Sequence, residues 1–484
     1  MTSDPALIHE LRKILGDGLL TAPESCVAFE CDALSTHRRI PDLVALPRTA
    51  DEVLAILAIC RRHGAPVVAR GAGTGLSGGA LPVAGGVLLV LSRLDRILEI
   101  NPDRRLARAQ PGVTNLAISE AAAPYGLHYA PDPSSQVACT IGGNVAENSG
   151  GVHCLKYGLT GHNLLEVRIA TIDGEVLTLG SETGDAPGLP LLPLVTGSEG
   201  MLGVVLEVTV RLLPVPERVE LLLAAFGSVA GCATAVSRIV AAGILPAGLE
   251  MMDAPAIRAA EAFAHCGYPL DAAALLLCEV DGLDADVADQ LERAQAVLRD
   301  SGATHVRVAA DAEERRRMWS GRKSAFPAVG RLAPDYYCMD GTIPRRHLAA
   351  VLERIDALSG EYGLPVANVF HAGDGNLHPL IMFDAGAGDE LQRAEKFGAE
   401  ILELCVEVGG TVTGEHGVGV EKLGPMCSQY GAPELEVFHA LKRAFDPHGL
   451  LNPGKAVPTL ARCADYGALR VQGGKLPFAH LPRF

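Results

Sequence analysis

The chain has 484 residues and a formal net charge of −16, with 48% hydrophobic and 20% charged residues. This length allows two domains with separate cores, and the composition is that of a globular protein and excludes a largely disordered one. The negative charge and the absence of any basic run argue against nucleic acid as a partner.

Targeting signals and cysteine spacing bear on the compartment. The N-terminus lacks a basic region followed by an apolar one, so no signal peptide is expected. The most apolar runs, such as residues 86–91 and 272–278, are far shorter than the ~20 residues that span a bilayer. Twelve cysteines are scattered without any Cys-x-x-Cys pair, which excludes an iron–sulfur run and favours a reducing compartment. We therefore expect a cytoplasmic protein that reaches the inner face of the membrane only through partner subunits.

The first clear element is a helix followed by a strand within residues 46–70. Thr49 and Glu52 have the spacing of a capping box, and apolar residues then recur at helical intervals. Gly64 is expected to end the helix. The residues Pro66-Val-Val-Ala-Arg70 then predict a buried strand.

A glycine-rich loop, Gly71-Ala-Gly-Thr-Gly-Leu-Ser-Gly-Gly79, follows that strand. It contains the dinucleotide pattern G-x-G-x-x-G, but residues 80–86 (Ala-Leu-Pro-Val-Ala-Gly-Gly) cannot form the helix that a Rossmann fold requires. A Walker loop is excluded because no Gly-Lys-Ser/Thr follows. The loop instead predicts backbone N–H groups that cradle a pyrophosphate without a long helix, although a turn without a ligand has the same composition. From residue 71 to 215, short apolar strands alternate with loops rich in Gly and Pro.

The predicted secondary-structure pattern changes near residues 213–216, where longer helical segments begin to alternate with strands. This alternation predicts an α+β layer packed beside the first domain, with an irregular tail after residue 446. The expected helices lie near residues 228–242, 284–300, 346–361, 387–408 and 433–444, and the expected strands near 272–280, 304–309, 336–343 and 366–383.

Two short motifs near the C-terminal end place three histidines and a carboxylate where a metal and a base could meet. In His371-Ala-Gly-Asp-Gly-Asn-Leu-His378, the dipeptide Asp374-Gly375 favours a two-residue hairpin turn, which predicts that His371 lies opposite His378. Side chains opposed in this way have Cβ atoms ~5 Å apart, close enough to share a metal ion. The second motif, Gly414-Glu-His-Gly417, supplies a carboxylate that suits zinc, manganese or iron. A lone histidine is more often structural, so the prediction depends on the paired motifs.

Several motifs, in the order in which they occur, resemble the flavoproteins of the vanillyl-alcohol oxidase type. The resemblance is strongest to the branch that contains glycolate oxidase flavin subunits and the D-lactate and D-2-hydroxyglutarate dehydrogenases. It covers roughly residues 38–456 and rests on Arg70–Gly75, Gln110–Val113, Pro131–Ser134, Thr140–Asn144, Asn148–Gly151, Lys156–Gly158, Gly197–Gly200, the two histidine motifs and Asn452–Lys455.

The resemblance implies an α+β fold with a two-part FAD-binding domain of that type and an α/β substrate domain with an antiparallel sheet. It divides the chain into residues 1–215 for FAD, 216–445 for the substrate and metal, and a segment 446–484 that returns to the FAD domain. Relatives with covalent flavin carry a His where this chain has Thr74, so non-covalent FAD is expected. The implied FAD-binding residues are Arg70, Gly71, Ala72, Gly73, Thr74, Gly75, Leu76, Ser77, Pro131, Asp132, Ser134, Thr140, Gly142, Gly143, Asn144, Asn148, Gly150, Gly151, Tyr157, Gly158, Glu199, Gly203, Val204 and Asn452.

The resemblance implies that a 2-hydroxy acid is oxidised by hydride transfer to flavin. The expected metal ligands are His371, His378 and Glu415, and a metal bound there would lower the pKa of the substrate hydroxyl. His416 is the expected general base. Arg322, in Trp319-Ser-Gly-Arg-Lys323, resembles the arginine that grips the substrate carboxylate, although a cation on a helix surface is the alternative.

Two departures from the D-2-hydroxyglutarate enzymes indicate a small substrate such as glycolate or D-lactate. The segment Tyr337–Pro344 lacks their lysine, and Pro379-Leu380 replaces a polar residue.

The leading hypothesis is the catalytic subunit of a glycolate oxidase, with a second FAD-binding subunit and an iron–sulfur subunit that carries electrons to quinone. The alternatives are a stand-alone D-lactate or D-2-hydroxyglutarate dehydrogenase and a non-catalytic FAD-binding accessory subunit.

Overall fold

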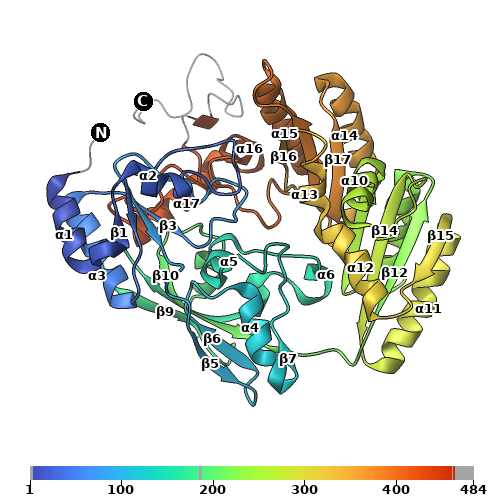
Figure 1. Ribbon diagram of the computed structural model, residues 1–484, viewed down its shortest axis with the longest axis horizontal. Coiled ribbons are helices and arrows are strands. Elements are labelled where there is room, and N and C mark those ends of the chain that lie inside the picture. Colours follow the sequence, from blue (N-terminus) through green and yellow to red (C-terminus); the bar gives the residue numbers. More distant parts are fainter. Residues whose placement is uncertain (1–3, 185–187, 460–461, 464–484) are drawn as a thin grey trace.

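The computed structural model describes residues 4–184, 188–459 and 462–463. Its fold is α+β, as expected, with helices packed on separate β-sheets (Figure 1). Three smaller sheets, of four, five and two strands, lie in one half of the molecule, and a seven-stranded sheet with its helices forms the other half. The two-stranded sheet pairs β7 (Leu127–His128) with β11 (Leu213–Pro214). Of the C-terminal segment expected at residues 446–484, residues 460–461 and 464–484 lie outside the described residues. No described helix combines the length and apolar character needed to cross a bilayer.

The first sheet lies in the half of the molecule that contains the N-terminus, and its strand order is β1-β2-β4-β3. Its strands are β1 (Leu19–Leu20), β2 (Leu43–Ala45), β4 (Val87–Val90) and β3 (Val67–Arg70). Helix α3 (Ala50–His63) connects β2 to β3, and helix α1 (Pro5–Leu15) packs beside α3. The Thr49 hydroxyl accepts a hydrogen bond from the Glu52 N–H, and Gly64 ends α3 in the left-handed conformation, as predicted. The Glu52 carboxylate accepts from the Arg48 N–H, one residue before the position expected for a capping box.

The second sheet is antiparallel and has the order β5-β6-β10-β8-β9. Its strands are β5 (Ile97–Asn101), β6 (Leu106–Ala109), β10 (Val204–Arg211), β8 (Leu164–Ala170) and β9 (Val176–Gly180). Helices α4 (Asn115–Ala122) and α5 (Ile141–Glu147) share a hydrophobic core with it. The N-terminus of α5 is capped by Thr140, whose hydroxyl accepts from the Gly143 N–H.

The third sheet is antiparallel, with the order β15-β12-β14-β13-β17-β18-β16. Neighbouring side chains on β12 alternate between two cores, as the two-residue period of a strand requires. Leu222 and Ala224 pack with the helices on one face of the sheet. Leu221 and Leu223 pack with the helices on the other face. The strands are β12 (Arg218–Phe226), β13 (Gly248–Asp253), β14 (Ala274–Gly282), β15 (Ala303–Val308), β16 (Asp335–Cys338), β17 (Val366–His371) and β18 (Asn376–Phe383).

Helices cover both faces of this third sheet, so both faces are buried. One face carries α9 (Val229–Ala241), α11 (Asp284–Asp300), α14 (Leu348–Tyr362) and α15 (Glu390–Glu407), and the other carries α10 (Ala254–Ala264), α12 (Ala312–Lys323) and α13 (Ala325–Val329). Every helix predicted in the second half of the sequence is present, the last being α17 (Ala432–Phe445). Strands β12 and β13 and helices α10 and α12 were not predicted.

The end of the chain returns to the first sheet after α17. Leu451 forms a parallel bridge with Val67 at the start of β3. The Asn452 amide donates hydrogen bonds to the carbonyls of Gly79 and Glu199, and the Lys455 ammonium donates to the Gly79 carbonyl at 2.8 Å. Residues from the last tenth of the sequence therefore fasten the glycine-rich loop in place.

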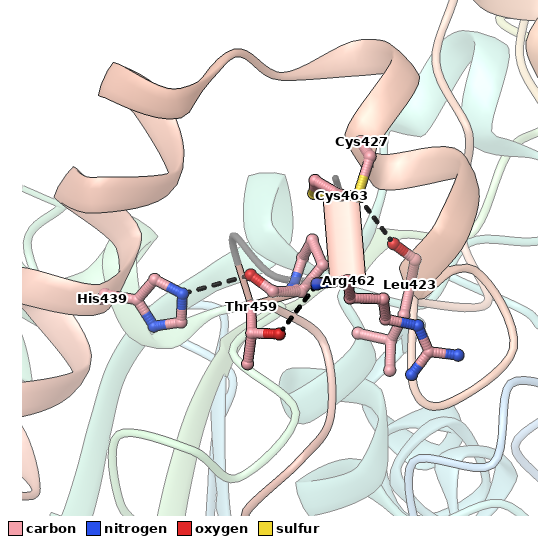
Figure 2. The surroundings of a disulfide bond; sticks show 7 residues. Leu423, Cys427, His439, Thr459, Arg462 and Cys463 are labelled. Atoms are coloured by element: carbon pink, nitrogen blue, oxygen red, sulfur yellow. Dashed lines mark hydrogen bonds between the residues drawn. A yellow bond between two sulfur atoms is a disulfide. The ribbon is translucent and has the colours of Figure 1, made fainter. Parts of the chain in front are cut away.

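A disulfide joins Cys427 to Cys463, next to the short helix α16 (Leu423–Gln429) (Figure 2). Nearby, the His439 ring lies 3.1 Å from the Pro458 carbonyl. The other ten cysteines are free thiols. The even scatter of cysteines along the sequence gave no sign that these two meet.

Candidate functional site

One cavity of about 460 Å³ brings the glycine-rich segments of the first half together with the histidine motifs of the second half. This volume lies within the usual range for ligand sites, ~300–1,000 Å³. The predicted residues that line it are Arg70, Gly71, Ala72, Gly73, Thr74, Gly75, Leu76, Ser134, Thr140, Gly142, Gly143, Asn144, Glu199, Gly203, Arg322, His371, His378, Glu415 and His416. Sequence reasoning missed several further lining residues, among them Glu147, Ser149 and Lys323.

The glycine-rich loop fits the pyrophosphate of a dinucleotide. Among the described residues, none of the N–H groups of residues 71–77 donates to another protein group. Residues 71–76 line the cavity, so their N–H groups are free to bind a ligand there, and a run of such N–H groups is a site for anionic oxygens. The loop approaches the start of α5 closely because Gly71 has no side chain, since a Cβ there would lie 2.2 Å from the Thr140 hydroxyl.

The other ten residues predicted to contact FAD lie outside the cavity lining, namely Ser77, Pro131, Asp132, Asn148, Gly150, Gly151, Tyr157, Gly158, Val204 and Asn452. Some have structural partners instead. The Tyr157 hydroxyl donates to Asp281 on β14 at 2.7 Å. Asp132 lies 2.9 Å from His153, whose other ring nitrogen lies 3.0 Å from Glu279 on β14. These contacts join the FAD-binding segment to the seven-stranded sheet.

The hairpin of β17 and β18 differs in register from the prediction. His371 lies opposite Asn376, and His378 lies opposite Val369. The predicted pairing of His371 with His378 is therefore wrong, because the loop contains four residues, 372–375. A two-residue type I′ turn needs positive φ at both Asp374 and Gly375, and only Gly375 has it. Instead, the Gly375 N–H donates to the His371 carbonyl.

The two histidines nevertheless share a face of the sheet. The register error is an even number of residues, so it does not move either side chain to the opposite face. Their ring centroids lie 5.0 Å apart, and both side chains are buried. The predicted meeting of His371 and His378 is thus correct, although they are diagonal neighbours and not direct cross-strand partners.

The Glu415 carboxylate lies between these two rings. Its Oε1 atom is 3.2 Å from Nε2 of His371 and 3.0 Å from Nε2 of His378. Burial alone would raise the pKa of Glu415, but the two histidines lower it well below its ordinary value. The carboxylate is therefore ionised. Two imidazole nitrogens and a carboxylate oxygen that converge in this way form a donor set suited to a divalent metal.

His416 is stacked on His378, with centroids 4.9 Å apart and planes at 9°. Its Nδ1 is buried and has no hydrogen-bond partner among the described residues. Burial, reinforced by the charge of His378, lowers the pKa of His416 to about 4 against the opposing effect of Asp340. A neutral ring with a free nitrogen can accept a proton at neutral pH.

Asp340, which sequence reasoning missed, holds the loop that carries Glu415 and His416. Its carboxylate accepts hydrogen bonds from the backbone N–H groups of Gly414, Glu415 and His416, at 2.9–3.2 Å. It also accepts from the Thr413 hydroxyl and the Lys422 ammonium. Asp340, His378, Glu415 and His416 have donor atoms within 4.8 Å of one another, so Asp340 is a geometric candidate for a ligand. His371 is not in this group, although its Nε2 lies 3.2 Å from the Glu415 carboxylate. The oxygens of Asp340 are already committed to the donors named above, so His371 is kept as the proposed third ligand.

Arg322, near the end of α12, is 1% exposed and lines the cavity. Its Nε lies 2.8 Å, and its Nη2 2.6 Å, from Oε2 of Glu250 on β13. The alternative of a cation on a helix surface is therefore wrong. Glu250 was also missed. Its only sequence signal is a single acidic residue inside the apolar segment Gly248-Leu-Glu-Met-Met252.

Comparisons with known proteins identify the family of this chain. Residues 41–180 match the family model "FAD binding domain", and residues 215–456 match "FAD linked oxidases, C-terminal domain". The chain is 62% identical over 466 residues to glycolate oxidase subunit GlcD of Escherichia coli (strain K12), covering 96% of this chain and 93% of that protein. It is 30% identical over 461 residues to D-lactate dehydrogenase of Anaerostipes hadrus, covering 93% of this chain and 97% of that protein.

The fold is also found among solved structures. The structure of p-cresol methylhydroxylase with substrate bound matches with a TM-score of 0.78 at 17% identity, covering 94% of this chain and 97% of that one. At this identity the likeness concerns the fold alone.

Proposed function

The chain belongs to the FAD-linked oxidases, and from this premise we propose that it is the catalytic subunit of a glycolate oxidase, which converts glycolate to glyoxylate and also D-lactate to pyruvate. One observation carries the proposal. The converging nitrogens of His371 and His378, the Glu415 carboxylate and the Arg322 guanidinium line the same cavity as the glycine-rich loop. Groups that can hold a 2-hydroxy acid therefore face the space expected for the flavin.

FAD is the cofactor, and we infer that it is bound without a covalent bond because Thr74 stands where the resemblance implies a histidine in relatives with covalent flavin. Bound FAD supplies the acceptor for the hydride that leaves the substrate. In this proposal residues 1–215 and the segment 446–484 form the FAD-binding domain, and residues 216–445 form the substrate domain. The free N–H groups of residues 71–77 would hold the pyrophosphate.

A divalent metal, zinc, manganese or iron, is proposed at His371, His378 and Glu415. A metal there supplies Lewis-acid chemistry that favours ionisation of the substrate hydroxyl. The protein's own residues do the rest. Arg322 orients the substrate through its carboxylate, and His416, neutral because of burial, accepts the hydroxyl proton.

We propose that electrons leave through partner subunits. The chain has no cysteine run that could hold an iron–sulfur cluster, so an iron–sulfur subunit and a second FAD-binding subunit are the expected partners. Quinone would be the final acceptor, and contact with the inner face of the cytoplasmic membrane would be indirect.

Turnover with a dye acceptor tests the proposal. The purified protein is mixed with glycolate, D-lactate or D-2-hydroxyglutarate, before and after exhaustive chelation. We expect flavin bleaching with glycolate and D-lactate, and loss of turnover after chelation that returns when metal is added. No bleaching with any of the three acids would reject the dehydrogenase and leave the accessory-subunit alternative. A preference for D-lactate or D-2-hydroxyglutarate, without partner subunits in pull-down, would favour a stand-alone dehydrogenase.

A further inference from the structure

Glu250 occupies an unusual position for a carboxylate. It lies in the middle of β13, an interior strand of the seven-stranded sheet, and its side chain has no exposure to solvent. A buried carboxylate is costly unless charged or hydrogen-bonding groups surround it. Its neighbours on the strand, Leu249 and Met251, face the core on the opposite side of the sheet. Glu250 therefore points toward the face that also carries α12.

Strand pairing places Glu250 directly beside His371. The two residues are opposite each other in the antiparallel pair of β13 and β17. Nδ1 of His371 lies 2.9 Å from both Oε1 and Oε2 of Glu250. A carboxylate only accepts hydrogen bonds, so Nδ1 carries a proton. Nε2 also lies 3.2 Å from the Glu415 carboxylate, and its proton is the one that a bound metal would replace, because Nδ1 is held by Glu250.

The same carboxylate holds Arg322. Oε2 of Glu250 accepts from Nε and lies 2.6 Å from Nη2 of the guanidinium. This contact occupies one edge of the guanidinium. The remaining N–H donors of Arg322 are left for another anion, and Arg322 lines the cavity. Glu250 thus touches two side chains on different elements that face one cavity.

We propose that Glu250 is a positioning residue that fixes the proton of His371 on Nδ1 and the guanidinium of Arg322 in a single orientation. The inference rests on the metal site proposed above. Two positive centres, the metal ion and the Arg322 guanidinium, must contact one small substrate. Glu250 lies against both His371 and Arg322, and its negative charge reduces the repulsion between these centres. Hydrogen-bond partners of metal-binding histidines typically change metal affinity by ~10–100-fold.

The substitution E250Q tests the proposal because it keeps the shape and removes the charge. Glutamine cannot present two accepting oxygens to Arg322 and His371 at once. If its amide group faces Nδ1, the histidine must carry its proton on Nε2, the nitrogen that should bind the metal. We expect the dissociation constants for Zn²⁺ and Mn²⁺, each measured alone by competition with a chromophoric chelator, to rise ~10–100-fold.

The matched control is E279Q on the adjacent strand β14. Glu279 also contacts a histidine, His153, and accepts a hydrogen bond from Trp319, but it touches none of the proposed ligands. E279Q should therefore bind both metals as the unaltered protein does. Nitrogen NMR of histidine-labelled protein gives a second readout that is independent of turnover. In the Zn²⁺-loaded protein, His371 should carry its proton on Nδ1, and it should lose that preference in E250Q.

The outcomes separate this proposal from the metal site itself. If the unaltered protein binds metal and E250Q binds it equally well with His371 unchanged, the role of Glu250 is overturned and the metal site stands. If the unaltered protein binds neither metal, both are overturned. Should E250Q fail to fold because Arg322 is left unpaired, the double variant E250Q/R322M removes that buried charge. It is expected to show the same ~10–100-fold loss of metal affinity, and normal affinity would overturn the proposal.

Discussion

The ammonium nitrogen of Lys422 lies 3.0 Å from a carboxylate oxygen of Asp340, and neither side chain is exposed to solvent. Lys422 also donates to the Gly417 carbonyl at 2.9 Å. Asp340 in turn accepts from the backbone of Gly414, Glu415 and His416. The short segment with the proposed ligand and base is therefore held by a buried ion pair that does not line the cavity.

Breaking this pair should damage both stability and turnover. Removing one partner of a buried ion pair costs about 3–5 kcal/mol, so K422M should lower the free energy of unfolding by that amount in urea titrations. Turnover should fall about 100-fold, because Glu415 and His416 lose their anchor. The control K396M changes an exposed lysine on α15 and should shift stability by less than about 0.5 kcal/mol. A K422M protein as stable and active as K396M would contradict this account of the loop.

The proposed base can be tested by H416N. Loss of a general base typically slows a reaction ~10²–10⁴-fold, and we expect flavin reduction by glycolate to slow by that factor in stopped-flow measurements. FAD should remain bound, because the glycine-rich loop is distant in sequence and held by other residues. H439N, on α17 and outside the cavity lining, is the control and should reduce flavin normally. Rapid flavin reduction by H416N would show that the base lies elsewhere.

The contacts of His153 should make stability depend on pH. Burial alone would lower the pKa of His153, but Asp132 and Glu279 raise it well above its ordinary value. Protonation is therefore favoured in the folded state. The stabilisation is complete below the unfolded pKa of ~6.5 and is lost as the pH rises through the higher folded pKa. H153Q should be destabilised by about 2 kcal/mol at pH ~6, and by less at alkaline pH.

Urea unfolding of both proteins across that pH range measures this difference. The control H448Q alters a half-exposed histidine near Asp173, which should contribute less than about 1 kcal/mol. A destabilisation of H153Q that is constant or grows with pH would have the wrong sign and would reject the proposed protonation of His153.

The flavin should leave the protein on denaturation. The glycine-rich loop, residues 71–79, contains no histidine, so it offers no side chain for histidyl attachment of the flavin. After precipitation with acid, all of the FAD is expected in the supernatant, where its fluorescence measures it against the protein concentration. Flavin retained in the washed pellet would contradict non-covalent binding.

Local signals in the sequence predicted the elements that depend on local physics. The cap at Thr49 and the left-handed Gly64 fix the ends of α3, and helical periodicity located α9 and α11 closely. Strand β12 has the continuous apolar run Leu221–Phe226, because both faces of the sheet are buried. Periodicity alone cannot distinguish such a run from a buried helix segment, and β12 was missed although the similar run in β14 was predicted.

In the candidate site, too, local sequence patterns predicted some residues and missed others. His371, His378 and Glu415 meet as predicted because alternation along a strand survives a register error of two residues. Glu250 and Asp340 could not be predicted, because each is one acidic residue whose partners are distant in sequence. Arg322 is 72 residues from Glu250. Which buried charges pair is decided by the order of strands in the sheet, and no local pattern encodes that order.

Because the chain returns to the glycine-rich loop only at Leu451–Lys455, the contacts of that loop are completed late in synthesis. The glycine-rich loop is made early, yet its fastening to Asn452 and Lys455 requires residues that are made 373 and 376 positions after Gly79. Until then Gly79 lacks these two donors, and the bridge from Val67 to Leu451 cannot form. Under the proposed FAD site, a chain truncated before residue 452 should therefore bind FAD less tightly than the full chain.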